Sequence, residues 1–151
     1  LAENLENDFL AINGDILTTI DYARFMDEHR QHGAALSIAV GRKEVLISLG
    51  IIDMDESSMI KGFREKPTYT FTTNMGLYIY NRRALEFITR GERLDLNILV
   101  TRLLEAGEKV YGFVSDDPYY WIDVGQHADY AQANEQFEQH RATFLPGGKP
   151  S

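Results

Sequence analysis

Two aspartates of this chain stand where short apolar runs meet a glycine. Asp15 ends the segment FLAINGD at residues 9–15, and Asp123 lies inside WIDVG at residues 121–125. Between them in sequence, FREKP at residues 63–67 contributes Lys66. In open α/β sheets, ligands bind just beyond the carboxyl ends of the strands. Two carboxylates and a lysine delivered there suit a hard divalent cation and a phosphorylated ligand, so the pattern points to chemistry on phosphates.

Each of these segments also has a purely structural interpretation. Asn-Gly-Asp is common turn chemistry, so Asp15 could simply belong to a turn. Asp123 is harder to explain in this way, because a carboxylate within an apolar run has to be paired, hydrogen-bonded or metal-bound. The tripeptide Glu65-Lys66-Pro67 could be an exposed, ion-paired strand end that proline terminates. For each segment taken alone, both interpretations stay open.

The composition excludes several classes of function. With 151 residues, the chain fits one domain by the usual range of roughly 100–200 residues. Its net charge of −8, from 15 basic and 23 acidic side chains, disfavours nucleic-acid binding. The absence of cysteine excludes disulfides and thiolate metal sites, and no apolar run approaches the roughly 20 residues of a membrane span. We therefore expect a cytoplasmic protein that binds neither nucleic acid nor membrane.

The elements that must position these residues mix helix-linked strands with hairpin-linked strands. Apolar runs predict strands at about residues 8–12, 34–40, 45–52, 59–66, 72–80, 109–115 and 119–124. Apolar periodicity and capping residues predict helices at about residues 21–32, 81–91, 94–107 and 126–140. His29 falls on the apolar face of the first helix, where a structural role is expected. The pattern predicts an α/β fold, a Rossmann-like sheet of mixed direction flanked by helices.

Six segments, taken in their order along the chain, resemble the sugar-1-phosphate nucleotidyltransferases, also called nucleotide-sugar pyrophosphorylases. They are NGD at 13–15, GIID at 50–53, FREKP at 63–67, NMGLY at 74–78, LEAGEKV at 104–110 and WIDVG at 121–125, which leads into DYAQA at 129–133. Any one of these motifs alone is weak, and their shared order from about residue 9 to 133 carries the resemblance.

The resemblance implies nucleotidyl transfer from an NTP to a sugar 1-phosphate, giving an NDP-sugar and pyrophosphate. It implies that Asp15 and Asp123 hold a catalytic Mg²⁺ and that Lys66 contacts the phosphate of the sugar phosphate. Glu65 and Asn74 would bind sugar hydroxyls. The implied substrate-binding set comprises Gly50, Glu65, Lys66, Asn74 and Gly76, in which the two glycines admit the sugar to the backbone. The sugar and the base stay open: glucose with thymidylate or uridylate, and mannose with guanylate, all fit.

Two departures from the family pattern shape the expected organisation. Gln126 stands where the family has threonine, and the family's opening loop, G-G-x-G-T-R followed by P-x-T and P-K, does not occur. That loop cradles the triphosphate and recognises the base. We therefore expect residues 1–144 to be the C-terminal portion of a catalytic domain, inactive alone, with a flexible tail at 145–151.

Two further expectations follow from the missing loop and its strand. Uncovered sheet edges favour pairing with a neighbouring chain, so we expect a homo-oligomer. The alternative function is a non-catalytic sugar-nucleotide-sensing or regulatory homologue of the same fold. The intact Asp15, Asp123 and Lys66 favour the enzyme, because a sensor need not keep a metal pair.

Overall fold

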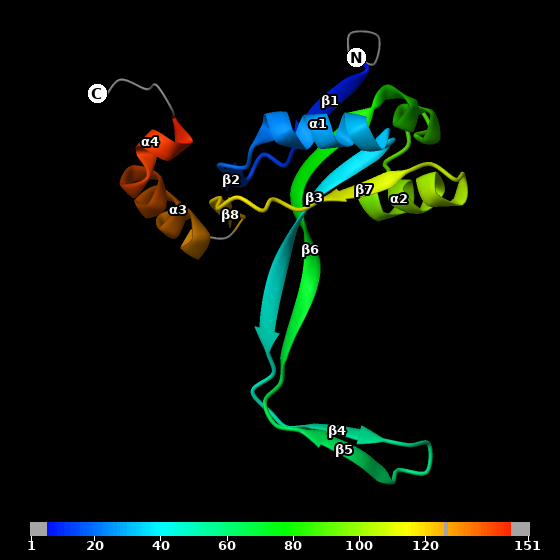
Figure 1. Ribbon diagram of the computed structural model, residues 1–151, viewed down its shortest axis with the longest axis vertical. Coiled ribbons are helices and arrows are strands. Elements are labelled where there is room, and N and C mark those ends of the chain that lie inside the picture. The colour runs from blue at the N-terminus through cyan, green and yellow to red at the C-terminus, as the bar shows by residue number, and fades with distance from the viewer. Residues whose placement is uncertain (1–5, 126, 146–151) are drawn as a thin grey trace. The chain divides into compact units, whose positions relative to one another are not determined.

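The structure is a computed structural model that describes residues 6–125 and 127–145 (Figure 1). Most of the tail expected after residue 144 therefore lies outside the described residues. The chain divides into two compact units. Among the described residues, unit 1 holds those up to Ala39 and from Asn74 onward, and unit 2 holds Val40–Thr73. Four of the seven expected functional residues therefore lie in unit 1 and three in unit 2, and we describe the two units separately.

Unit 1 contains a four-stranded sheet of mixed direction, as the sequence predicts. Its strands lie in the order β1, β6, β3 and β7, with bounds Asp8–Ile12, Thr68–Asn81, Leu36–Leu46 and Val110–Phe113. Strand β1 is antiparallel to β6, and β7 is parallel to β3. Both β3 and β6 continue into unit 2. The expected end of β3 at residue 40 is wrong, because the strand runs on through the polar segment 41–44.

The first helix of unit 1 begins and ends at the residues that the sequence singles out, whereas the helix expected at about 81–91 is a 3₁₀ helix that ends at Phe87. The first helix, α1 (Tyr22–His32), starts where the Asp21 side chain accepts from Arg24 N at 3.0 Å, and it ends at Gly33 with φ of 59°. A 3₁₀ helix, η2 (Arg82–Phe87), follows its cap at Asn81. The remaining helices are α2 (Leu96–Glu105), α3 (His127–Gln139) and α4 (Arg141–Phe144). No helix within the described residues is long and apolar enough to cross a membrane.

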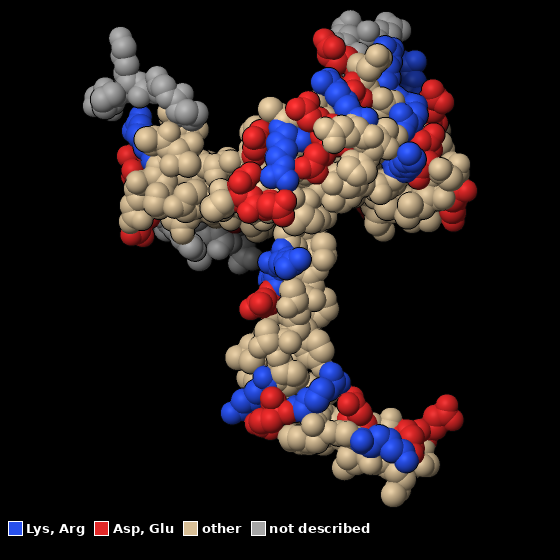
Figure 2. All heavy atoms as spheres, in the orientation of Figure 1, with Lys and Arg blue, Asp and Glu red and all other residues tan. Residues whose placement is uncertain are grey.

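Acidic and basic side chains lie next to each other over the surface of α1 (Figure 2). Arg24 is the centre of one such group: its guanidinium donates to Glu28 at 2.9 Å, and to Asp116 and Asp117 at 3.0 Å each. These contacts tie α1 to the turn that follows β7. Because the aspartates are exposed, we attribute little stability to the ion pairs beyond fixing that turn.

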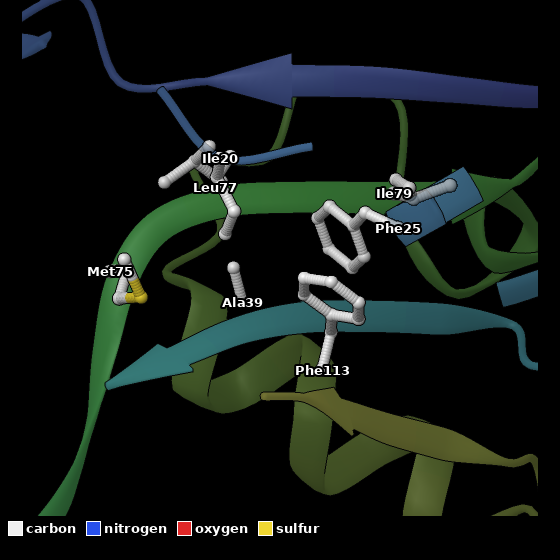
Figure 3. Close-up of a cluster of buried hydrophobic side chains, with 7 residues drawn as sticks. All are labelled: Ile20, Phe25, Ala39, Met75, Leu77, Ile79 and Phe113. Carbon is white, nitrogen blue, oxygen red and sulfur yellow. The ribbon is translucent and has the colours of Figure 1, made fainter. Parts of the chain in front are cut away.

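The core of unit 1 has two layers, one on each face of β6, because successive side chains of a strand point to opposite faces. On the face of α1, Phe25 stacks on Phe113 with ring centroids 4.7 Å apart (Figure 3). The buried cluster around them also contains Ile20, Ala39, Met75, Leu77 and Ile79. On the other face, Tyr78 packs with Leu99 and Leu103 of α2 and with Leu36. The sheet is thus covered on both faces, as in an α/β fold.

Unit 2 contains an antiparallel hairpin of β4 (Ile51–Met54) and β5 (Ile60–Arg64). Its loop is held by Asp55, whose carboxylate accepts from the Ser57 hydroxyl at 2.7 Å and from Met59 N at 3.0 Å. The hydrogen bond from Ser57 and the ion pair with Lys61 lower the pKa of Asp55 to about 2. The acidic segment 53–58 is therefore an exposed hairpin tip organised around one aspartate.

Candidate functional site

A short two-stranded sheet in unit 1 brings the two aspartates together. Strand β2 (Ile16–Thr18) pairs antiparallel with β8 (Trp121–Asp123), and Ile16 lies opposite Asp123. One residue earlier, the Asp15 carbonyl accepts from Val124 N at 2.8 Å. Because β2 begins directly after Asp15, this pairing fixes the turn that carries Asp15 against the end of β8. The sequence did not predict β2.

The two carboxylates flank Gly125. The backbone N–H of Gly125 donates to Asp123 Oδ1 at 3.0 Å. A Cβ atom placed on Gly125 would lie 3.1 Å from Asp123 Oδ1 and 3.6 Å from Asp15 Oδ2. Both carboxylates therefore border the same small space, which glycine leaves free. Both side chains are exposed, so Asp123 does not need the buried partner that its apolar neighbours suggested.

The chemistry of this pair fits a hard divalent cation. Carboxylate oxygens are the donors that such ions prefer, and Mg²⁺ in particular is commonly bound through one or two carboxylates plus substrate phosphates and water. Among the side chains that the structure describes, those of residues 6–125 and 133–145, no group of three or more His, Cys, Asp or Glu is arranged to hold a metal. Asp15 and Asp123 thus suit an ion whose remaining ligands arrive with a phosphorylated substrate.

Strand β6 departs from regular strand geometry at Gly76, and we call the segment Asn74–Gly76 the β6 bend. Gly76 adopts φ of 76°, a region that favours glycine, and its N–H donates to Asn74 Oδ1 at 2.9 Å. The other end of the Asn74 amide donates to the Tyr78 hydroxyl at 2.8 Å. A Cβ on Gly76 would lie 2.9 Å from Asn13 Nδ2. Gly76 therefore has a structural reason to be glycine, independent of any sugar.

The β6 bend contacts both segments that carry the aspartates. The Gly76 carbonyl accepts from Asn13 N at 2.9 Å, and the Met75 carbonyl accepts from Trp121 Nε1 at 2.8 Å. The structure thus places Asn74 and Gly76 in the same neighbourhood of unit 1 as Asp15 and Asp123. Sequence reasoning gave neither Asn13 nor Trp121 a role in the site. The one signal in the sequence that could have identified Trp121 is its indole N–H, a hydrogen-bond donor two positions before Asp123.

The other three expected residues form a group of their own in unit 2. A Cβ on Gly50 would lie 2.5 Å from Phe63 Cζ and 3.3 Å from Glu65 Oε2, so these two side chains lie over this glycine. Lys66 Nζ lies 3.8 Å from Glu65 Oε1, and both side chains are exposed.

The backbone of Lys66 is unusual. Its φ is 42°, in the left-handed region, and it directly precedes Pro67. Such a conformation is unfavourable for a residue with a side chain and costs on the order of 1–2 kcal/mol. Strain of this kind is often retained where a side chain has to be presented in one direction, which favours a functional role for Lys66.

Comparisons with known proteins identify the same family that the order of the motifs resembles. The sequence profile of the nucleotidyl transferase family matches residues 1–140. The chain is 29% identical over 135 residues to UTP–glucose-1-phosphate uridylyltransferase of Synechocystis, which covers 85% of this chain and 34% of that protein. It is 28% identical over 139 residues to mannose-1-phosphate guanylyltransferase of Mycobacterium tuberculosis, which covers 89% of this chain and 38% of that protein. The chain thus spans little more than a third of the length of these relatives.

Solved structures show the same fold. HddC from Yersinia pseudotuberculosis matches with a TM-score of 0.60 and 26% identity, covering 90% of this chain and 58% of that chain. A protein assigned as a glucose-1-phosphate thymidylyltransferase from Bacillus anthracis, solved with sucrose, matches with a TM-score of 0.63. Its identity is 17%, and the match covers 98% of this chain and 60% of that one, so it bears on the fold alone.

Proposed function

The chain belongs to the nucleotidyl transferase family, the family of the sugar-1-phosphate nucleotidyltransferases, and we propose that it carries the sugar-phosphate and metal part of such an active site. The observation that carries this proposal is the pair of carboxylates, Asp15 and Asp123, that border the space beside Gly125. The proposed reaction joins an NTP and a sugar 1-phosphate to give an NDP-sugar and pyrophosphate.

In this reaction, an oxygen of the sugar phosphate attacks the α-phosphorus of the NTP. The bond from that phosphorus to the oxygen bridging to the β-phosphate breaks, and the electron pair leaves with pyrophosphate. The attacking oxygen is already ionised at neutral pH, so no side chain has to act as a general base. The difficulty is to bring anionic groups together in line, which is a problem of positioning and charge.

The described residues address that problem with fixed charges and hydrogen-bonding groups. Asp15 and Asp123 would hold Mg²⁺, which supplies charge neutralisation on the phosphates when it is bound. Lys66 would neutralise the phosphate of the sugar 1-phosphate. Glu65 and Asn74 would bind sugar hydroxyls, for which each retains hydrogen-bonding capacity. Gly50 and Gly76 would let the sugar approach the backbone.

A complete active site would also need a binding site for the triphosphate of the NTP. The sequence has no glycine-rich triphosphate loop, so we propose that residues outside this chain supply the cradle for the NTP. Residues 1–144 would then be the later portion of a catalytic domain, 145–151 its flexible tail, and the chain alone would not turn over. We also propose a homo-oligomer in the cytoplasm, a state that mass measurement in solution tests directly.

Binding and turnover of the 151-residue chain test the proposal separately. In titration calorimetry with Mg²⁺ present, we expect glucose 1-phosphate or mannose 1-phosphate to bind, and Asp123→Asn to abolish that binding without unfolding the chain. Equal binding by wild type and D123N would contradict the assigned metal role. Pyrophosphate release with several NTPs should stay at background. Robust turnover by the chain alone would refute the claim of a partial site, while leaving the family unchanged.

A further inference from the structure

Two consecutive carbonyls of the β6 bend each accept a hydrogen bond from a residue that lies two positions before one of the aspartates. The Gly76 carbonyl accepts from the backbone of Asn13, two residues before Asp15. The Met75 carbonyl accepts from the indole of Trp121, two residues before Asp123. In addition to the pairing of β2 with β8, the separation of the two carboxylates therefore depends on neighbouring peptide groups of one strand.

The acceptor side of this arrangement is fixed in the core. Met75 is 3% exposed and belongs to the buried cluster around Phe25 and Phe113. The bend itself is set by the hydrogen bond from Gly76 N to Asn74 Oδ1 and by the positive φ of Gly76. An acceptor held in this way does not follow small movements of β8, so its hydrogen bond can dictate where β8 lies.

The donor side depends on the indole. Strand β8 has three residues and pairs with β2, which also has three. The preceding residue, Tyr120, is tied to the same β2 side, because its carbonyl accepts from Thr18 Oγ1 at 2.7 Å and from Thr19 N at 3.0 Å. The Trp121 hydrogen bond instead reaches β6. Trp121 remains 37% exposed, so burial of its ring accounts for only part of what holds β8 in place, and the directional hydrogen bond is a separate contribution.

We infer that Trp121 is a positioning residue for the cation site: its indole N–H, donated to the Met75 carbonyl, sets Asp123 against Asp15. This inference rests on the proposed function, because it gives Trp121 a role only if the two carboxylates bind the ion together. Trp121 itself touches neither the ion nor the reacting phosphates in this role.

The test compares Mn²⁺ affinity, measured by electron paramagnetic resonance in the presence of glucose 1-phosphate, among variants of the 151-residue chain. Trp121→Phe keeps an aromatic ring and removes the N–H. We expect it to weaken Mn²⁺ binding by about tenfold, the lower end of what outer partners of metal ligands contribute. Tyr119→Phe is the matched control: it removes the hydroxyl that lies 3.7 Å from Met75 Sδ, and it should leave Mn²⁺ affinity unchanged. All titrations are made below the unfolding temperature of each variant.

A second measurement needs no substitution. Trp121 is the sole tryptophan, so its indole N–H gives a single, assigned resonance in proton–nitrogen spectra. We expect this proton to exchange slowly with solvent despite the exposed ring. Its resonance should broaden when Mn²⁺ binds and should shift when diamagnetic Mg²⁺ is added to the metal-free protein.

The outcomes separate this inference from the function on which it rests. If D123N loses Mn²⁺ while W121F binds it like wild type, Trp121 does not position the site and the metal assignment stands. If neither Asp15→Asn nor D123N changes Mn²⁺ binding, the metal assignment and the inference both fail. An unprotected indole proton overturns the inference even if W121F does not fold.

Discussion

His29 Nδ1 lies 2.7 Å from Ser37 Oγ in the interior of unit 1, and its other ring nitrogen lies 3.4 Å from Asp8 Oδ1. The ring is 1% exposed, and burial lowers its pKa below the ordinary value of 6.5 although Asp8 opposes the shift. Arg30 and Arg83 add to the lowering. The buried imidazole is thus a neutral group that joins α1 to β3 through Ser37 and lies beside Asp8 of β1.

This burial predicts a stability that falls in weak acid. Well above pH 6.5, His29 is neutral in both the folded and the unfolded chain and contributes no pH dependence. Below that value the unfolded chain takes up a proton that the folded chain resists, so the free energy of unfolding decreases as the pH falls toward the lowered pKa. Urea denaturation between about pH 5 and 8 measures this slope. In His29→Gln, which cannot titrate, the slope should flatten over that range. An unchanged slope would assign the effect to another group.

Gly125→Ala should damage the cation site more than the fold. The added Cβ would lie 3.1 Å from Asp123 Oδ1, closer than most such contacts, and 3.6 Å from Asp15 Oδ2. Gly125 is exposed, so the chain around it can adjust without disturbing the core. We expect weaker Mn²⁺ binding with an unfolding temperature close to that of wild type. Gly14→Ala is the matched control, since nothing lies within 4 Å of a Cβ there. Equal Mn²⁺ affinities in the two variants would show that the space beside Gly125 is not part of the site.

Gly76→Ala should destabilise unit 1 by about 1–2 kcal/mol, because alanine is strained at positive φ. Part of the cost comes from Asn13, whose Nδ2 would lie 2.9 Å from the new Cβ. Denaturant unfolding of Gly76→Ala, Asn13→Ala and the double variant separates the two contributions. Because the two residues are in contact, the double variant should lose less stability than the two single losses together. Strict additivity would contradict the packing of Asn13 on Gly76.

Lys66→Gly should separate stability from binding. Glycine adopts the φ of 42° without steric cost, so the variant should be as stable as wild type or more stable. It loses the ammonium group, so binding of a sugar 1-phosphate should fall sharply in calorimetry. Lys66→Ala should lose the same binding without the gain in stability. If both variants bind like wild type, Lys66 serves only as the ion-pair partner of Glu65.

The local signals in the sequence predicted elements better than they predicted pairings. Asp21 and Gly33 mark the ends of α1 because a cap acts through its nearest backbone groups. Strand β2 was missed because a three-residue strand has too few side chains to show alternation, and its partner β8 lies about a hundred residues away. The continuation of β3 through residues 41–44 was missed for a related reason: its polar side chains resemble those of a turn.

The candidate site shows the same division. The motifs identified Asp15 and Asp123, because their residue types and their order along the chain are visible in sequence. Nothing in sequence showed that Trp121 bonds to the Met75 carbonyl or that Asn13 packs over Gly76, since both contacts depend on the long-range register of β6.

The length of β6 has an evolutionary consequence. This strand runs without interruption from Thr68, two residues after Lys66, to Asn81. A single-residue insertion or deletion between Lys66 and Met75 would exchange the two faces of the strand beyond it, sending core side chains to the wrong side. The loop that joins β4 to β5, residues 55–59, carries no such constraint. Among related proteins, length differences in this region should therefore accumulate at the hairpin tip, and the interval from the lysine to the β6 bend should keep a constant number of residues.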